Sequence, residues 1–123
     1  MRKFHWALPL AVMSALAGAP AQADDGGGQV VVATHIDIIP NFVTQAQPLI
    51  EQFVVDSRND PGALYFTVIT WTPTTNHFQL LEVFKNRQTF DLHVSADHTI
   101  TFRNQLQPFI GAPYDEQLYT NNP

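Results

Sequence analysis

The sequence of 123 residues contains no cysteine and few basic side chains. The lack of cysteine excludes a disulfide scaffold, a zinc ribbon and a thiol nucleophile. The sequence has 6 Lys+Arg against 11 Asp+Glu and contains no basic cluster. Binding to a phosphate backbone requires a patch of positive charge, so we expect no nucleic-acid partner. The hydrophobic fraction of 45% is too high for a disordered chain, and the length fits one domain.

Long apolar runs are also missing, apart from one near the N-terminus. Residues 6–19 are apolar but too few to span a bilayer stably, and they lie between a basic start and the small-x-small sequence Ala21-Gln22-Ala23. These features predict a secretory signal peptide over residues 1–23, with an uncleaved anchor or a core helix as the alternative. Residues 24–29 then form a flexible N-terminal segment. We expect a periplasmic or secreted protein with no membrane attachment after cleavage.

Four later segments have the composition of β-strands. They are rich in β-branched and aromatic residues and are bounded by proline, glycine or polar residues. The predicted strands cover residues 29–39, 63–71, 77–85 and 114–120. The last strand is the most polar, so we place it at an edge of the sheet.

The segments between the strands carry apolar residues at helical spacing. One helix is predicted to end near Arg58, and Pro48 implies that it begins late or kinks. A second helical region follows a predicted N-cap at Asn86 and runs to about residue 94. Ser95 is expected to cap a further segment. The apolar face of that segment contains Phe102, Leu106, Phe109 and Ile110.

The resulting βαββαβ order predicts an α+β fold of the ferredoxin-like type over residues 30–120, a four-stranded antiparallel sheet with helices on one face. The strands are apolar on both faces. In the second strand one face is expected to carry Leu64, Phe66 and Val68, and the other Tyr65, Ile69 and Trp71. A sheet with one wet face would alternate apolar and polar residues. We therefore expect a homodimer in which a second copy covers the free face, with a partly apolar monomer as the alternative.

The acidic residue Glu82 lies in the middle of a predicted strand, on the face of Phe78, Leu80 and Phe84. A carboxylate at this position must be paired, protonated or facing a cavity, because unpaired burial is costly. An ion pair with a helix residue such as Arg103 would leave Glu82 without a chemical role.

Two histidines follow Glu82 in the helical region. His93 and His98 would lie about 140° apart on one continuous helix, so they converge only if the helix breaks between them. A break at Ser95-Ala96-Asp97 would let both line one pocket with Glu82 as an acid–base group. Metal binding by the same three residues is the rival interpretation, although their spacing matches no known ligand motif.

The remaining histidines are less informative. We interpret His77, at the predicted hairpin, as an ordinary surface residue. His35 in the first strand either lies on the second face of the sheet or donates into a cavity. The sequence has no glycine-rich phosphate loop, dinucleotide-binding fingerprint or nucleophile elbow, so we expect no bound nucleotide or flavin.

Three short motifs, taken in order, resemble the antibiotic biosynthesis monooxygenase family. They are Asp60-Pro61-Gly62-Ala63-Leu64, Glu82-x-Phe84 and His93-Val94-Ser95-Ala96-Asp97-His98. The resemblance covers about Val30 to Tyr119 and implies a dimeric α+β barrel with Glu82, His93 and His98 at the catalytic positions. Phe84 stands where many members carry tryptophan. His35 stands where the haem-degrading branch has asparagine, and both departures argue against haem cleavage.

The resemblance also implies a monooxygenase that oxidises a quinol or polyphenolic aromatic with O2 and needs no cofactor and no metal. A deprotonated phenol is electron-rich enough to react with O2 directly, so the protein must supply a pocket, orientation and a base. His93 or His98 would be the base, and Glu82 would hold its tautomer. The expected substrate-binding residues are His35, Phe66, Trp71 and Phe84. The alternative is a non-catalytic dimer that binds a small ligand.

Overall fold

The computed structural model describes residues 27–120, so the predicted signal peptide lies outside the described residues. The main elements are β1 (Val30–Asp37), α2 (Val43–Ser57), β2 (Ala63–Thr70), β3 (His77–Phe84), α3 (Arg87–Ser95), α4 (Asp97–Leu106) and β4 (Asp115–Thr120). Two 3-10 segments, η2 (Pro40–Phe42) and η3 (Gln107–Phe109), flank α2 and α4. Over this range, no helix combines the length and the hydropathy needed to cross a bilayer.

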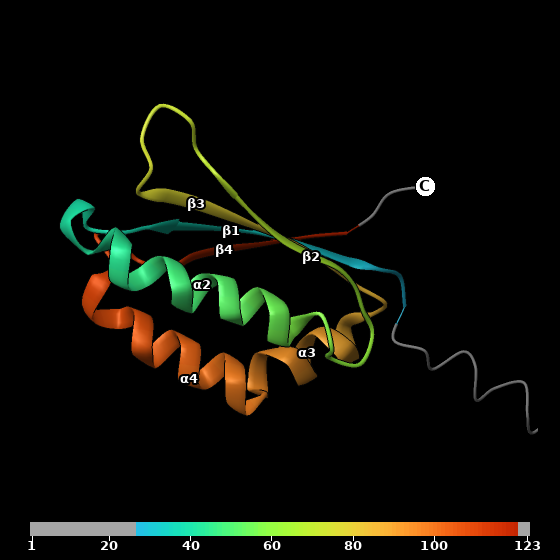
Figure 1. Cartoon of the computed structure of the whole chain (residues 1–123). Coiled ribbons are helices and arrows are strands. Elements are labelled where there is room, and N and C mark those ends of the chain that lie inside the picture. The colour runs from blue at the N-terminus through green and yellow to red at the C-terminus, as the bar shows by residue number, and fades with distance from the viewer. Residues whose placement is uncertain (1–26, 121–123) are drawn as a thin grey trace, which may run out of the picture.

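The four strands form one antiparallel sheet in the order β2-β3-β1-β4. Figure 1 shows α2, α3 and α4 together on one side of this sheet, while its other face carries no helix. The predicted ferredoxin-like α+β fold is confirmed. β4 is an edge strand, as its polar composition predicts.

The core lies between the sheet and the helices. Every second residue of β3, from Phe78 to Phe84, is buried, and β1 is buried in the same rhythm from Val32 to Ile36. The helices contribute apolar residues at the predicted spacing, among them Ala46, Ile50, Phe53, Phe102 and Leu106. Glu82 is therefore placed inside this core by the period-two geometry of its strand.

A β-bulge corrects the predicted facing of one residue in β2. Phe84 pairs with Ala63, while Val83 pairs with Tyr65, so Leu64 is an extra residue in the ladder. The bulge turns Leu64 away from the core, and 54% of it is exposed. The expectation that Leu64 shares the face of Phe66 is therefore wrong.

The helical segments also differ from the predictions in detail. α2 begins at Val43 and contains Pro48, which denies the Thr44 carbonyl its usual donor. Ser95 does not cap α4, because its hydroxyl donates to carbonyls of the preceding α3 turn and the N-cap of α4 is Ala96. Phe109 lies beyond α4 in η3, since Pro108 cannot continue the α-helix.

Residues on the uncovered face form rows across the strands. One row contains Tyr65, Val83, Val31 and Tyr119, which are paired in register across β2, β3, β1 and β4. The other end of the strands carries His35, Gln79 and His77 beside Ile69, which pairs with Gln79. The free face is thus divided into an apolar end and a histidine-containing end.

Candidate functional site

A tight turn before β2 holds the first residue of the site. The Ala63 N–H donates to the Asp60 carbonyl at 3.1 Å, with Pro61 and Gly62 between them. Gly62 has a φ of 77°, which a turn of this proline–glycine pattern requires at its third position. The turn fixes the Asp60 backbone beside the helices.

The helix breaks where the sequence permits it. Ala96 has an extended conformation, with φ −67° and ψ 146°, between the end of α3 and the start of α4. This break brings the rings of His93 and His98 to a centroid distance of 6.1 Å. The break on which the convergence of the two histidines depends is therefore present.

One carboxylate oxygen contacts both imidazoles. Asp60 Oδ2 lies 2.7 Å from His93 Nδ1 and 3.0 Å from His98 Nε2. A carboxylate that accepts from both nitrogens fixes the proton of each neutral ring on the nitrogen that faces it. Asp60 therefore sets the tautomers, a role that the sequence suggested for Glu82.

Glu82 lies behind His93, with only 1% of it exposed. The Thr34 hydroxyl donates to Glu82 Oε2 at 3.3 Å. Oε1 has no hydrogen-bond partner among residues 27–120 and lies 3.7 Å from His93 Nε2. Arg103 donates instead to Glu116 at 2.8 Å. The alternative in which Arg103 bonds Glu82 is not realised.

Burial determines the charge of the inner pair. It raises the pKa of Glu82 to about 8, and the Glu116 carboxylate adds to this shift, whereas the Thr34 hydrogen bond and Arg103 oppose it. Burial lowers the pKa of His93, and the contact with Asp60 opposes that change. Near neutral pH both groups are therefore uncharged.

The interior around His93 is filled by aromatic rings. Phe53, Phe66, Phe84 and Phe90 have centroids 4.9 to 6.4 Å from the His93 ring. His93 and Glu82 therefore do not line an open pocket, which corrects the expected arrangement. A substrate cannot reach them without movement of these rings.

His98 is the accessible member of the cluster. A quarter of its side chain (25%) is exposed, and it lines a hollow of about 310 Å³ between α2 and α4. Phe53 and Phe102 also line this hollow, with their rings stacked at 4.0 Å and 4°. The hollow is large enough for an aromatic molecule of one or two rings.

The same cluster has donor atoms for a cation. Suitable atoms of Asp60, His93 and His98 lie within 4.8 Å of one another. Two imidazoles and one carboxylate are also a ligand set used by iron in non-haem oxygenases. In the structure both imidazoles are hydrogen-bonded to one oxygen of Asp60, so the three side chains form a hydrogen-bond network with one another.

Comparison with known proteins identifies the family. The model of the antibiotic biosynthesis monooxygenase family matches residues 29–105. The chain belongs to this family. The resemblance carried by the three motifs is therefore confirmed, and the Asp60 turn, Glu82, His93 and His98 all lie within the matched residues.

Relatives of this monooxygenase family member are distant in sequence. The uncharacterized protein sll1783 of Synechocystis sp. is 25% identical over 103 residues, which is 81% of this chain and 70% of that protein. The solved structure of Rv0793 from Mycobacterium tuberculosis has a TM-score of 0.74 at 16% identity, covering 78% of this chain and 97% of that one. A crystal structure of an antibiotic biosynthesis monooxygenase has a TM-score of 0.73 at 19% identity, covering 76% and 99%. These structures share the fold.

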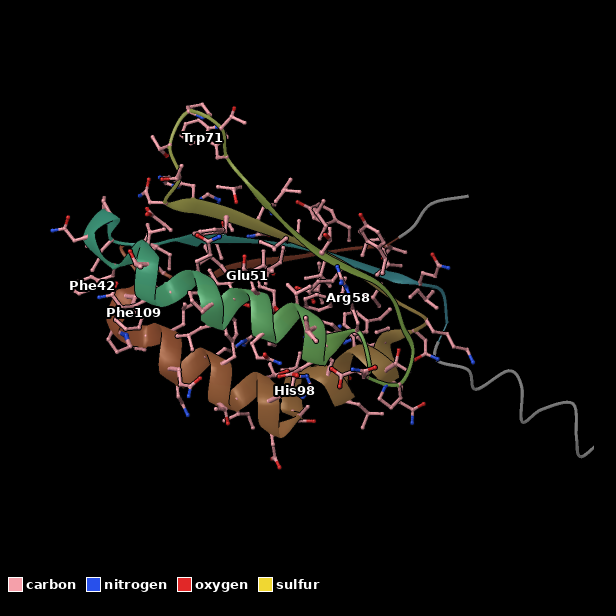
Figure 2. All side chains as sticks on the ribbon, in the orientation of Figure 1. Phe42, Glu51, Arg58, Trp71, His98 and Phe109 are labelled. Carbon is pink, nitrogen blue, oxygen red and sulfur yellow. The ribbon has the colours of Figure 1, made fainter. Side chains whose placement is uncertain are left out.

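The structure separates the residues that were expected to bind one substrate. Phe66 and Phe84 are buried on the helix side of the sheet, whereas His35 and Trp71 line a hollow at the β2–β3 hairpin. Figure 2 shows Trp71 in the hairpin, far from His98 among the helices. The four residues therefore cannot line one pocket, because strand alternation and the sheet itself place them on opposite sides.

Two functional candidates were missed in the sequence. Asp60 was seen only as part of a turn, although an acid in the family's acid–Pro–Gly turn was a usable signal. His77 is interpreted above as an ordinary surface residue, but its Nδ1 lies 3.1 Å from Nε2 of His35. No local signal predicted that contact, because it joins diagonal neighbours on two strands.

Proposed function

We propose that this chain is a cofactor-independent monooxygenase that oxidises a quinol or related polyphenolic aromatic with O2. The observation that carries the proposal is the partly exposed His98 ring, hydrogen-bonded to Asp60 at an aromatic-lined hollow. A base of this kind, held in place beside an aromatic surface, is what activation of a phenol requires.

His98 is the proposed base. Its Nε2–H donates to Asp60, so in the neutral ring Nδ1 carries the lone pair, and Nδ1 has no hydrogen-bond partner among residues 27–120. Nδ1 would take the proton of a substrate hydroxyl, and the Asp60 carboxylate would stabilise the imidazolium that forms. Leu49, Phe53 and Phe102 line the hollow and would form the apolar wall against which the ring of the substrate lies.

The buried pair keeps Asp60 in place. His93, whose side chain is 1% exposed, donates to the same Asp60 oxygen through Nδ1. The protonated Glu82 lies next to the other ring nitrogen of His93, Nε2. We assign His93 and Glu82 a positioning role, because neither reaches the hollow. In the proposed reaction one quinol and one O2 give one hydroxyquinone and one water. The ring supplies all four electrons: one oxygen atom replaces a ring hydrogen, and the other leaves as water with two protons as the quinol becomes a quinone.

The proposal is tested with an oxygen electrode and a menadiol-type quinol. We expect His98→Ala to lower the turnover rate by roughly a hundredfold or more, the usual contribution of a general base. Asp60→Asn should also lower turnover, because an amide stabilises the imidazolium less than a carboxylate does.

Asn104→Ala, at an exposed position of α4 outside the hollow, is the matched control and should retain the wild-type rate. Circular dichroism establishes that each variant is folded. If the folded His98→Ala variant oxidises the quinol as fast as the control, His98 is not the base.

A second candidate function is a non-catalytic, small-ligand-binding protein. The aromatic rings that fill the space around His93 favour it, because this interior leaves the buried His–Glu pair no access to a ligand. A wild-type protein that binds quinols without any oxygen uptake would establish this function instead.

We also propose that the protein is exported after cleavage near Ala23 and acts as a homodimer. The export proposal rests on the N-terminal sequence alone. The dimer proposal is supported by the apolar row on the uncovered face of the sheet, which a second copy would bury.

A further inference from the structure

A second hollow lies at the histidine-containing end of the uncovered face. It has a volume of about 660 Å³ and is formed by the ends of β2 and β3, the start of their connection, and β1. Its lining includes Ile69, Trp71, His35, His77 and Gln79. This mixture of apolar wall and a few polar groups, at this size, is typical of sites for small organic ligands.

Trp71 provides the apolar wall. The residue is 56% exposed, although tryptophan is highly buried on average. The Trp71 backbone N–H donates to the His77 carbonyl at 3.0 Å, and the indole and imidazole rings meet edge to face with centroids 5.5 Å apart. The indole is therefore held against the polar end of the hollow with much of its surface free.

A hydrogen-bond acceptor in the hollow comes from the contacts among His35, His77 and Asp37. His35 Nε2 lies 3.1 Å from His77 Nδ1, so one nitrogen donates and the other accepts. Asp37 Oδ1 lies 3.9 Å from His77 Nε2 and favours the proton at that nitrogen. His77 Nδ1 then accepts from His35 Nε2–H, which leaves His35 Nδ1 as an acceptor with no hydrogen-bond partner among residues 27–120.

The surroundings of this acceptor select against anions. Asp115 pairs in register with His35 on the neighbouring strand, and Asp37 flanks His77. Two carboxylates near the histidine pair repel a negatively charged ligand. A neutral ligand that donates a hydrogen bond fits the site.

We propose that this hollow is a second binding site, which takes a neutral, planar, fused-ring aromatic molecule that carries a hydroxyl group. The ring would lie against Trp71 and the hydroxyl would donate to His35. The site lies on the opposite side of the sheet from His98, so its occupation does not depend on the chemistry proposed there.

Binding of 2-naphthol to the full chain, measured by isothermal titration calorimetry, tests the proposal. The probe is a fused-ring phenol and not a quinol, so binding is read without turnover. We expect 2-methoxynaphthalene, which has the same rings but no donor, to bind roughly tenfold more weakly, the usual effect of one hydrogen bond to a buried or half-buried partner.

Variants locate the site. Trp71→Ala and His35→Gln should each weaken 2-naphthol binding about tenfold. Leu92→Ala removes an apolar side chain of similar exposure, 52%, from the helix side and should not change it. His98→Ala should also leave the affinity unchanged.

Each other outcome overturns the proposal. Absence of binding at millimolar 2-naphthol, or equal affinity for the methyl ether, would remove the site or its hydrogen bond. Binding that survives both Trp71→Ala and His35→Gln but is lost in His98→Ala would place the ligand at the helix-side hollow. By contrast, loss of oxygen uptake in His98→Ala with unchanged naphthol binding would support the proposal, because it shows that the two sites are separate.

Discussion

Glu82 shows how a single residue depends on its strand. Strand alternation alone places its carboxylate in the core, and the structure leaves 1% of it exposed. Its neighbours could not be predicted in the same way. Thr34 contacts it across the sheet and His93 from α3, and these contacts depend on how distant segments pack.

The raised pKa of Glu82 predicts a specific dependence of stability on pH. Between the ordinary value of 4.5 and about 8, the native protein keeps a proton that the unfolded chain has lost. The contribution of Glu82 to the free energy of unfolding is therefore full at acid pH and falls as pH rises, by roughly 1.4 kcal/mol per pH unit. Glu82→Gln cannot ionise and should lack this decline.

Urea unfolding of both proteins at about pH 5 and about pH 8 measures the effect. The difference between wild type and Glu82→Gln isolates Glu82, because His93 titrates in both proteins. If both proteins lose the same stability between the two pH values, Glu82 is not a buried acid with a raised pKa.

At the scale of elements, two short backbone features assemble the site. The turn that begins at Asp60 and the break at Ala96 bring together the residue before β2 and residues of α3 and α4. The sequence predicts the turn through Pro61-Gly62, and it allows the break at Ser95-Ala96-Asp97, where a further helical segment is expected to begin. It does not predict that they meet, nor the bulge at Leu64, because a bulge leaves no periodic signal in one strand.

Gly62 is the residue on which the turn depends most. Its φ of 77° disfavours any side chain, and a Cβ there would overlap the Thr89 side chain in the first turn of α3. We expect Gly62→Ala to lower the free energy of unfolding by about 2 kcal/mol and the melting temperature by roughly 10 °C.

Gly111→Ala is the matched control, because a Cβ at Gly111 would meet its neighbours at ordinary contact distances of 3.4 Å or more. Thermal unfolding followed by circular dichroism compares the two variants. Equal melting temperatures would show that the turn does not need glycine.

The whole molecule has one covered and one uncovered sheet face, as Figure 1 shows. Composition and strand order predict this layout, because two helical regions cannot cover both faces of four strands. The division of the uncovered face into an apolar end and a histidine-containing end was not predicted. It depends on the exact register of the four strands.

The apolar end predicts self-association. Val83 lies in the middle of the row with Tyr65, Val31 and Tyr119, so Val83→Glu would place a charge at the centre of the proposed interface. We expect the wild type to be a dimer at micromolar concentration and Val83→Glu to be a monomer by light scattering.

Ile100→Glu, at a 49% exposed position of α4 on the covered side, should remain a dimer. A wild-type protein that scatters as a single subunit would contradict the proposed dimer. So would a Val83→Glu variant that is folded and still dimeric.

Oxygen uptake by the purified chain with a menadiol-type quinol, before and after exhaustive treatment with a metal chelator, tests the central proposal most directly. In the proposed mechanism the Asp60–His93–His98 cluster transfers a proton and needs no metal, so we predict the same rate of uptake in both samples. No uptake in either sample, or uptake that is lost on chelation and restored by an added divalent metal, would contradict the proposal.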